Sequence, residues 1–325
     1  MYLDMLPTLI KKALGLGLLM AMIPLAPAET PAKNKPYKIV YIAGIASDPY
    51  YIALNRGAQA EAQKQGATVQ FSGSPSAFSP STQIPFLNAA IAQKPDLIMI
   101  APTDIVAMQQ PIQTAVSAGI PVILVDTTLK DPSIAITSIG FDNLTGGAQA
   151  ADALAKVIGG KGKVAVVSTT LGTSTGDDRV RGFNQQMASK YPDIKNIGTS
   201  YAGDDTTKAA SVLKGLLTSH PDLAGVFTIN GIVGDGVTIA AKEAGAENKL
   251  KLVEYGSSAS QVQGVQNGTV TALIGPSPYT IGELGVRLGI QYLQGKKDLQ
   301  KHYDTDQGIL TKENVDDPKN KPFEY

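Results

Sequence analysis

The sequence predicts an α/β protein with two doubly wound parallel-sheet lobes. Three observations lead to this fold class. Short apolar runs alternate with longer helical patterns from residue 38 to about residue 310, which is typical of repeated strand–helix units. The alternation restarts near residue 140, so two series follow each other. The length of 325 residues agrees with about two domains of roughly 100–200 residues each.

The first series begins with the apolar run 38–44, which has few polar breaks, as expected of a strand buried on both faces. Asp48 and Pro49 end this strand, and the spacing of small and apolar residues predicts a helix over 50–65 that stops at Gly66. The same patterns predict further strands at 67–71, 97–100, 121–125 and 134–139, and further helices at 82–93 and 104–119.

The second series repeats the alternation. Its strands are expected at 163–167, 194–201, 225–229, 250–255, 270–274 and 308–310. Its helices are expected at 144–158, 179–190, 206–219, 233–244, 258–267 and 281–293, and a charged tail follows. Because repeated strand–helix units form parallel sheets covered by helices, ligands are expected beyond the carboxyl ends of the strands.

Residues 1–28 have the composition of a secretory signal peptide. Two lysines precede the apolar run 13–25, and small residues frame a cleavage site after Ala28. The run is shorter than the ~20 apolar residues of a membrane span; the alternative interpretation is a buried N-terminal helix. No cysteine follows the signal, which favours a soluble periplasmic product over a lipid-anchored one. Residues 29–36 are expected to be a flexible leader.

Composition excludes several classes of function. The 28 Lys and Arg balance the 28 Asp and Glu, so no global basic field would attract nucleic acid. The absence of cysteine excludes disulfides and thiolate nucleophiles, and two histidines leave little for a multi-histidine metal site or a histidine base. We therefore expect no catalytic residue, no metal and no cofactor.

Polar and aromatic residues recur where the predicted strands end. Such groups offer hydrogen-bond donors and acceptors for hydroxyls and flat rings for apolar faces, as a neutral hydroxylated ligand requires. Many of these residue types are also ordinary loop and helix-capping residues. The candidate ligand-binding residues are Asp48, Tyr50, Tyr51, Asp126, Thr127, Asp177, Arg179, Asp204, Asn230, Gly256, Ser257 and Pro276.

Over residues 37–311 the chain resembles the periplasmic sugar-binding proteins of the ribose/galactose type, the receptors of ABC importers. The resemblance rests on the order and spacing of Asp48-Pro49-Tyr50-Tyr51, Pro102-Thr103-Asp104, Asp142-Asn143, Gly172-Thr173-Ser174 with Arg179, His220-Pro221-Asp222-Leu223, and Val226-Phe227 to Asn230. It implies the type I periplasmic binding protein fold, with lobes 37–140 plus 277–301 and 141–276 plus 302–325. Three crossings near 140, 276 and 301–303 would form the hinge, with the ligand in the cleft.

The resemblance also implies roles for residues. Tyr50 and Tyr51 would sandwich the ligand, Asp48 would accept a hydroxyl, and Asp126 and Asn230 keep the residue types of the family. The departures from the family pattern are Thr127 and Asp177 in place of arginines, Asp204 in place of an aromatic residue, Gly256 in place of an aspartate and Pro276 in place of a glutamine. The cleft is thus similar in plan, with fewer cations and more carboxylates.

The resulting hypothesis is a periplasmic receptor of an ABC importer that binds a sugar or polyol and closes about its hinge. An ABC permease is the expected partner, a chemoreceptor is a further candidate, and a monomer is expected. The same fold binding a cationic amine or an autoinducer-2-like signal stays open as an alternative. An exported glycosidase using Asp177 and Asp204 is disfavoured, and a sugar-responsive repressor is rejected because an export signal stands where its DNA-binding domain would lie.

Overall fold

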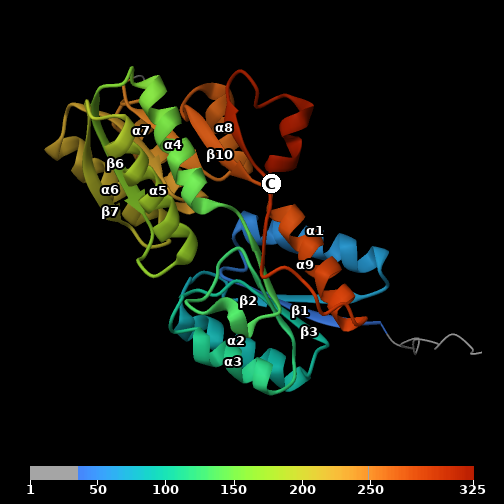
Figure 1. The fold of residues 1–325 in the computed structure, drawn as a ribbon. Helices are drawn as coiled ribbons and strands as arrows, with labels where there is room; N and C mark the ends of the chain where they lie inside the picture. The colour runs from blue at the N-terminus through green and yellow to red at the C-terminus, as the bar shows by residue number, and fades with distance from the viewer. Residues whose placement is uncertain (1–35, 248) are drawn as a thin grey trace, which may run out of the picture. The chain divides into compact units, whose positions relative to one another are not determined.

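Two six-stranded sheets organise the part of the chain that the structure describes (Figure 1). This computed structural model describes residues 36–247 and 249–325, so the predicted signal peptide and most of the predicted leader lie outside it. The first sheet has the order β11 (His302–Asp304), β5 (Thr137–Gly140), β4 (Val122–Val125), β3 (Leu97–Ile100), β1 (Lys38–Ala43) and β2 (Thr68–Gly73). All its neighbouring strands are parallel.

The second sheet repeats this plan with one reversal. Its order is β12 (Gln307–Thr311), β10 (Ala272–Pro276), β9 (Lys251–Tyr255), β8 (Leu223–Thr228), β6 (Gly162–Ser168) and β7 (Ile194–Tyr201). Only the pairing of β10 with β12 is antiparallel among these strands. We call each sheet with the helices that cover it a lobe.

Helices cover both faces of each sheet, as expected of a doubly wound fold. On the first sheet, α1 (Pro49–Lys64) and α9 (Pro278–Leu293) pack on one face, and α2 (Pro80–Gln93) and α3 (Gln109–Ser117) pack on the other. On the second sheet, α4 (Asn143–Val157) and α5 (Ser174–Lys190) lie opposite α6 (Thr206–Ser219) and α7 (Gly231–Glu243), while α8 (Ala259–Asn267) packs near β10 and β12.

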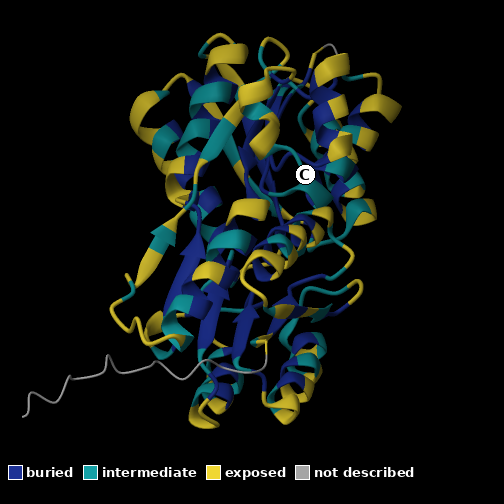
Figure 2. Cartoon of the chain, turned by 90° about the vertical axis from the view of Figure 1, so that its right-hand side faces the viewer, coloured by how far each residue is buried: buried dark blue, intermediate teal, exposed yellow. Residues whose placement is uncertain are grey.

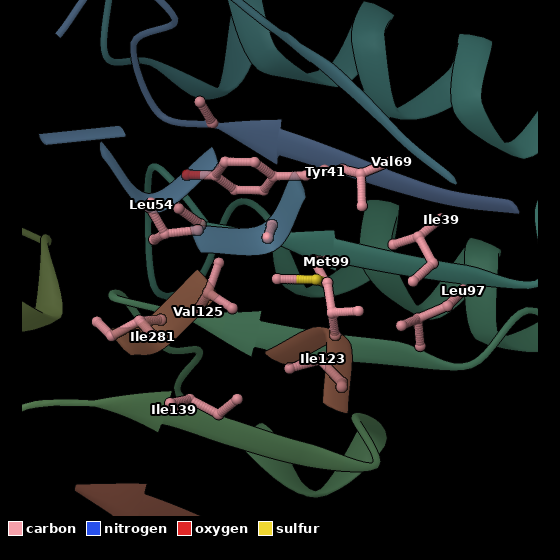
Figure 3. Packing of buried hydrophobic residues seen from close by; sticks show 14 of the residues in the cluster. Ile39, Tyr41, Leu54, Val69, Leu97, Met99, Ile123, Val125, Ile139 and Ile281 are labelled. Atoms are coloured by element: carbon pink, nitrogen blue, oxygen red, sulfur yellow. The ribbon is translucent and has the colours of Figure 1, made fainter. Parts of the chain in front are cut away.

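The central strands of both sheets are buried, while the outer helix faces are exposed (Figure 2). In the first lobe, Ile39, Met99, Ile123 and Ile139 from four adjacent strands belong to one buried apolar cluster with Leu54 of α1 (Figure 3). Within the described residues, no helix combines the length and the apolar character needed to span a bilayer.

The chain passes between the two sheets three times. It does so after β5, after β10, and between β11 and β12. The third crossing differs in place from the expected 301–303, because residues 302–304 pair with β5 in the first sheet. The sequence predicts these residues in the second lobe, because a three-residue strand is too short to leave a pattern in the sequence.

Several element boundaries also differ from the sequence predictions. The helix expected from residue 104 begins at Gln109, because the Asp104 carboxylate accepts the N–H groups of Val106 and Ala107 and forms a separate turn. The helix expected from residue 179 begins five residues earlier, at Ser174. In place of an extended start to the fifth strand there is a short 3-10 helix, Pro132–Ile134. Another, Pro318–Phe323, lies in the predicted charged tail.

Candidate ligand-binding site

A cavity lies at the carboxyl ends of strands from both sheets. Its volume is about 60 Å³. Both lobes contribute to its wall, in keeping with the rule that open α/β sheets bind ligands beyond their strand ends. The lining residues are Ile45, Asp48, Tyr50, Tyr51, Phe78, Asp126, Thr169, Thr173, Thr175, Arg179, Asp204, Ile229, Asn230, Gly231, Tyr255, Gly256, Pro276 and Tyr325.

The first lobe contributes two tyrosines that share one carboxylate. The Tyr50 hydroxyl donates to Asp126 Oδ1 at 2.8 Å, and the Tyr51 hydroxyl donates to Oδ2 at 2.9 Å. Asp126 follows β4 directly and has a φ of 64°, in the left-handed region that non-glycine residues rarely occupy. A backbone in this region costs of order 1–3 kcal/mol and is found mainly at functional sites. The first lobe thus holds both rings in place through one strained residue.

Asp48 caps the helix that carries these tyrosines. Its carboxylate accepts the N–H of Tyr50 at 2.9 Å, and Pro49 occupies the first turn, where a proline fits without loss of a hydrogen bond. This cap fixes where α1 begins. Tyr50 and Tyr51, in the first turn of α1, therefore face the cavity.

The second lobe contributes a buried arginine held in a fixed orientation. Arg179 Nε donates to Asn143 Oδ1 and Nη1 donates to the carbonyl of Ile229, each at 2.8 Å. Its guanidinium lies 3.5 Å from the centre of the Tyr255 ring. These contacts use only part of the guanidinium's five donors, so others remain available to the cavity. The early start of α5 at Ser174 places Arg179 on the second helical turn beside the cleft.

A second polar pair stands on the same lobe. Asn230 caps α7 through its Oδ1 and donates from Nδ2 to Asp204 Oδ1 at 2.8 Å. Because the amide oxygen is fixed by the cap, the orientation of the amide is set and Asp204 receives a defined donor. This pair presents a carboxylate to the cavity opposite Asp48.

Burial and mutual repulsion disfavour the charged forms of the cavity's carboxyls. Burial first, and then the Asp204 and Asp126 carboxylates among others, raise the pKa of Asp48 to about 6. Burial also raises the pKa of Asp126, although Arg179 opposes this, and it raises the pKa of Asp204. The same burial and Asp126 raise the pKa of Tyr50, so its phenol stays a neutral donor.

Three of the candidate residues do not line the cavity. The Thr127 hydroxyl turns away and donates to the carbonyl of Pro102. Asp177 lies in the first turn of α5, where its carboxylate accepts the N–H of Gly172 at 3.0 Å. The Ser257 hydroxyl donates to the carbonyl of Phe323. The remaining nine candidates, from Asp48 to Pro276, are brought together in the lining.

Sequence reasoning missed several lining residues. Thr169 follows β6 directly, so the strand-end rule could have found it. Tyr325 stands in a tail with no periodic pattern, and nothing in the sequence indicates that the tail returns to the cleft. Within the described residues, no group of three or more His, Asp or Glu side chains is placed to hold a metal ion.

A family model described as "Periplasmic binding protein domain" matches residues 39–297. The chain belongs to this family. Its relatives include the ribose import binding protein RbsB of Salmonella typhimurium, 29% identical over 275 residues, which cover 85% of this chain and 90% of that protein. A xylitol-binding protein of Mycolicibacterium smegmatis is 31% identical over 202 residues, covering 58% of this chain and 57% of that protein.

Solved structures of the family agree with the fold. An ABC transporter solute-binding protein of Agrobacterium vitis, bound with α-D-tagatopyranose, is 38% identical with a TM-score of 0.86 and covers 89% of this chain and 99% of its own. A carbohydrate transporter solute-binding protein of Agrobacterium radiobacter, in complex with D-arabinose, is 28% identical with a TM-score of 0.85 and the same coverage. The two-lobe, type I architecture expected from the sequence is confirmed.

Proposed function

We propose that the protein is the solute-binding receptor of an ABC importer and binds a sugar or polyol between its lobes. One observation carries the proposal: a single cavity is bordered by strand ends of both sheets and lined with carboxylates, hydroxyls, an amide, a guanidinium and tyrosine rings. These groups match the donors, acceptors and apolar faces of a hydroxylated solute. Membership of the periplasmic binding protein family and its sugar-binding relatives support this assignment.

The size of the cavity favours one small solute. A cavity of about 60 Å³ is small, so in this arrangement of the lobes it favours a small solute over an oligosaccharide. Tyr50 and Tyr51 would pack against its ring carbons. Asp48 and Asp204 would accept from its hydroxyls, and Arg179 would donate to its oxygens.

Direct contacts between the lobes give closure a structural basis. The N–H of Ile105, in the loop after β3, donates to the carbonyl of Gly172 at 3.1 Å, and the N–H of Thr128 donates to Ser174 Oγ at 3.0 Å. A solute that contacts both walls would add to these bonds and shift the equilibrium towards the closed form. The closed form would then dock on an ABC permease, and a chemoreceptor would be a further protein that binds it.

Export is part of the same proposal. Residues 1–28 would direct the chain to the periplasm, where an importer receptor acts, and would then be removed. N-terminal sequencing of the protein purified from a periplasmic extract should start at Glu29. A start at Met1 would contradict this part of the proposal.

Calorimetric titration with a panel of D-ribose, D-tagatose, D-arabinose, D-allose, D-fucose and xylitol tests the function. At least one solute should bind with micromolar or tighter affinity, and Arg179→Ala should weaken it at least tenfold. The matched control is Arg181→Ala, because Arg181 lies two residues further along α5 and pairs with Asp178 near the surface. Absence of binding across the panel would refute the proposal.

A second candidate is a cationic solute such as an amine or amino sugar. Three carboxylates line the cavity against one guanidinium in the described part of the chain. An amine would relieve their repulsion, since buried like charges are costly without a counter-ion. A polyamine panel that raises the melting temperature while the sugars do not would favour this candidate.

A further inference from the structure

The segment 318–325 brings one residue, Tyr325, into the lining of the ligand cavity. The 3-10 helix Pro318–Phe323 follows β12, and Phe323 packs against the apolar cluster formed by α8, β10 and β12. The carbonyl of Phe323 accepts from the Ser257 hydroxyl, and the N–H of Tyr325 donates to the carbonyl of Ser257 at 3.2 Å. The segment is therefore tied to the loop between β9 and α8, which borders the cavity. The family model ends at residue 297, well before it.

These bonds place the Tyr325 side chain in the cleft, opposite the first lobe. Its ring meets the Tyr50 ring edge-on, with centroids 5.6 Å apart and planes at 86°. Tyr50 meets Tyr51 in the same way at 5.2 Å, so three rings form a continuous wall. The end of the chain, marked C in Figure 1, accordingly lies between α8 and α1. An edge-to-face contact of this kind adds attraction beyond the buried area alone.

The neighbouring backbone leaves room for this side chain. Gly256 has a φ of 120°, and a Cβ added there would lie 3.0 Å from the Tyr325 hydroxyl and 2.6 Å from Gln261 Oε1. A residue with a side chain at position 256 would be strained in its backbone, would collide with Gln261 Oε1 and would press against the Tyr325 hydroxyl. The space beside the β9 strand end is thus filled by the Tyr325 phenol.

We propose that Tyr325 is a solute-contacting residue of the second lobe that narrows the cleft and selects for small hydroxylated solutes. This rests on the proposed function. Its ring supplies an apolar face opposite Tyr50, and its hydroxyl supplies a donor near Asp48. Burial, and then the Asp48 carboxylate, raise the pKa of Tyr325, while a hydrogen bond from the Ser257 backbone opposes this, so the phenol keeps its proton in neutral solution.

Two variants separate the hydroxyl from the ring. Tyr325→Phe keeps the ring contact with Tyr50 and removes one hydrogen bond, so affinity for the best solute of the sugar and polyol panel should fall roughly 2- to 10-fold. Tyr325→Leu also removes the ring, so affinity should fall further and bulkier solutes of the panel should gain relative to smaller ones. Tyr201→Phe is the control, because Tyr201 is 46% exposed on β7 and does not line the cavity.

A second measurement needs no solute. Small-angle X-ray scattering of the unliganded protein should give a larger radius of gyration for Tyr325→Leu than for wild type or Tyr325→Phe, because the ring contact between the lobes is lost. Wild-type affinity in both variants, or an unchanged radius in Tyr325→Leu, would overturn the proposal. If wild type binds nothing in the panel but the radius increases as expected, the proposed function fails while the place of Tyr325 in the cleft wall is upheld.

Discussion

Glu254 should make the stability of the protein fall as pH rises towards neutrality. Its side chain is 1% exposed on β9 and accepts hydrogen bonds from Thr238 Oγ1 at 2.7 Å and from Gln261 Nε2 at 3.0 Å. Both donors are neutral, and among the described residues no Lys, Arg or His forms an ion pair with it. Burial, with the nearby Asp235 adding to it, raises the pKa of Glu254 from 4.5 to about 7.

The difference between the pKa of Glu254 in the folded and in the unfolded protein sets the sign and size of the change in stability with pH. Below pH 4.5 the carboxyl is protonated in both the folded and the unfolded state, so it costs nothing. As pH rises from about 4.5 to 7, the unfolded chain ionises first, and the folded state loses up to about 3 kcal/mol at 1.36 kcal/mol per pH unit. Glu254→Gln removes the titration and retains an acceptor and a donor. We therefore expect it to be more stable than wild type at pH 8 and no more stable at pH 4.5.

Thermal unfolding between pH 4.5 and 8.5 measures this directly. At roughly 2 °C per kcal/mol for a chain of this size, the variant should melt about 6 °C above wild type at pH 8. Glu61→Gln is the matched control. Burial raises the pKa of Glu61, but hydrogen bonds from Gln65 and Arg287 outweigh it and hold the pKa below its usual value, so this change should lower the melting temperature at pH 8. Parallel pH curves for wild type and Glu254→Gln would refute the reasoning.

Three further substitutions test other parts of the molecule. Asp48→Asn keeps the cap on the Tyr50 N–H but removes a carboxyl whose pKa is about 6. In denaturant titrations the unliganded variant should be more stable than wild type at pH 7.5 by roughly 1 kcal/mol, because partial exposure reduces the full effect of the pKa shift. A difference between variant and wild type that is no larger at pH 7.5 than at pH 4 would contradict this. Arg179→Lys loses the two guanidinium hydrogen bonds to Asn143 Oδ1 and the Ile229 carbonyl, so the free energy of unfolding should fall by about 1.5–3 kcal/mol. An unchanged denaturant midpoint would show that these bonds do not stabilise the fold. Gly182→Ala puts a Cβ 2.0 Å from a carbonyl oxygen of α4 and should destabilise the protein by roughly 1–3 kcal/mol. Gly215→Ala is the control, because open space surrounds Gly215, and it should stabilise the protein by about 0.5–1 kcal/mol. Equal effects of the two substitutions would contradict the close crossing of α4 and α5.

The strands could be predicted because each is a short apolar run bounded by turn residues. The run 38–44 became β1, Lys38–Ala43, buried at all positions but the first. Since parallel strands end at one edge, the approximate place of the cleft followed from the strands alone. What the sequence could not supply was the direction of each side chain at that edge. Asp126 and Thr127 are neighbours, yet the positive φ of Asp126 turns one carboxylate into the cavity and leaves the threonine beside Pro102.

Helix starts caused a second kind of error. The sequence Ser174–Asp178 is rich in small and polar residues and was expected to be a loop, but it forms the first turn of α5. Asp177 there accepts the N–H of Gly172 and is not among the residues that line the cavity. Tyr325 marks the limit of such reasoning, because a non-periodic tail has no local signal for the long-range contacts that fix it.

Whether the carboxylates of the cavity require a cationic solute depends on the hydrogen bonds that each accepts, and their number alone does not decide it. Asp126 already receives two tyrosine hydroxyls, and Asp204 receives the amide of Asn230. Asp48 receives one backbone N–H, so Asp48 and Asp204 each keep more capacity to accept than Asp126 does. Carboxylates that have neutral donors need no cation to be stable, and raised pKa values allow Asp48 to hold a proton part of the time near pH 6. An excess of acidic residues is therefore weaker evidence for a cationic solute than their number implies, and the arrangement suits a neutral solute whose hydroxyls complete the bonding of Asp48.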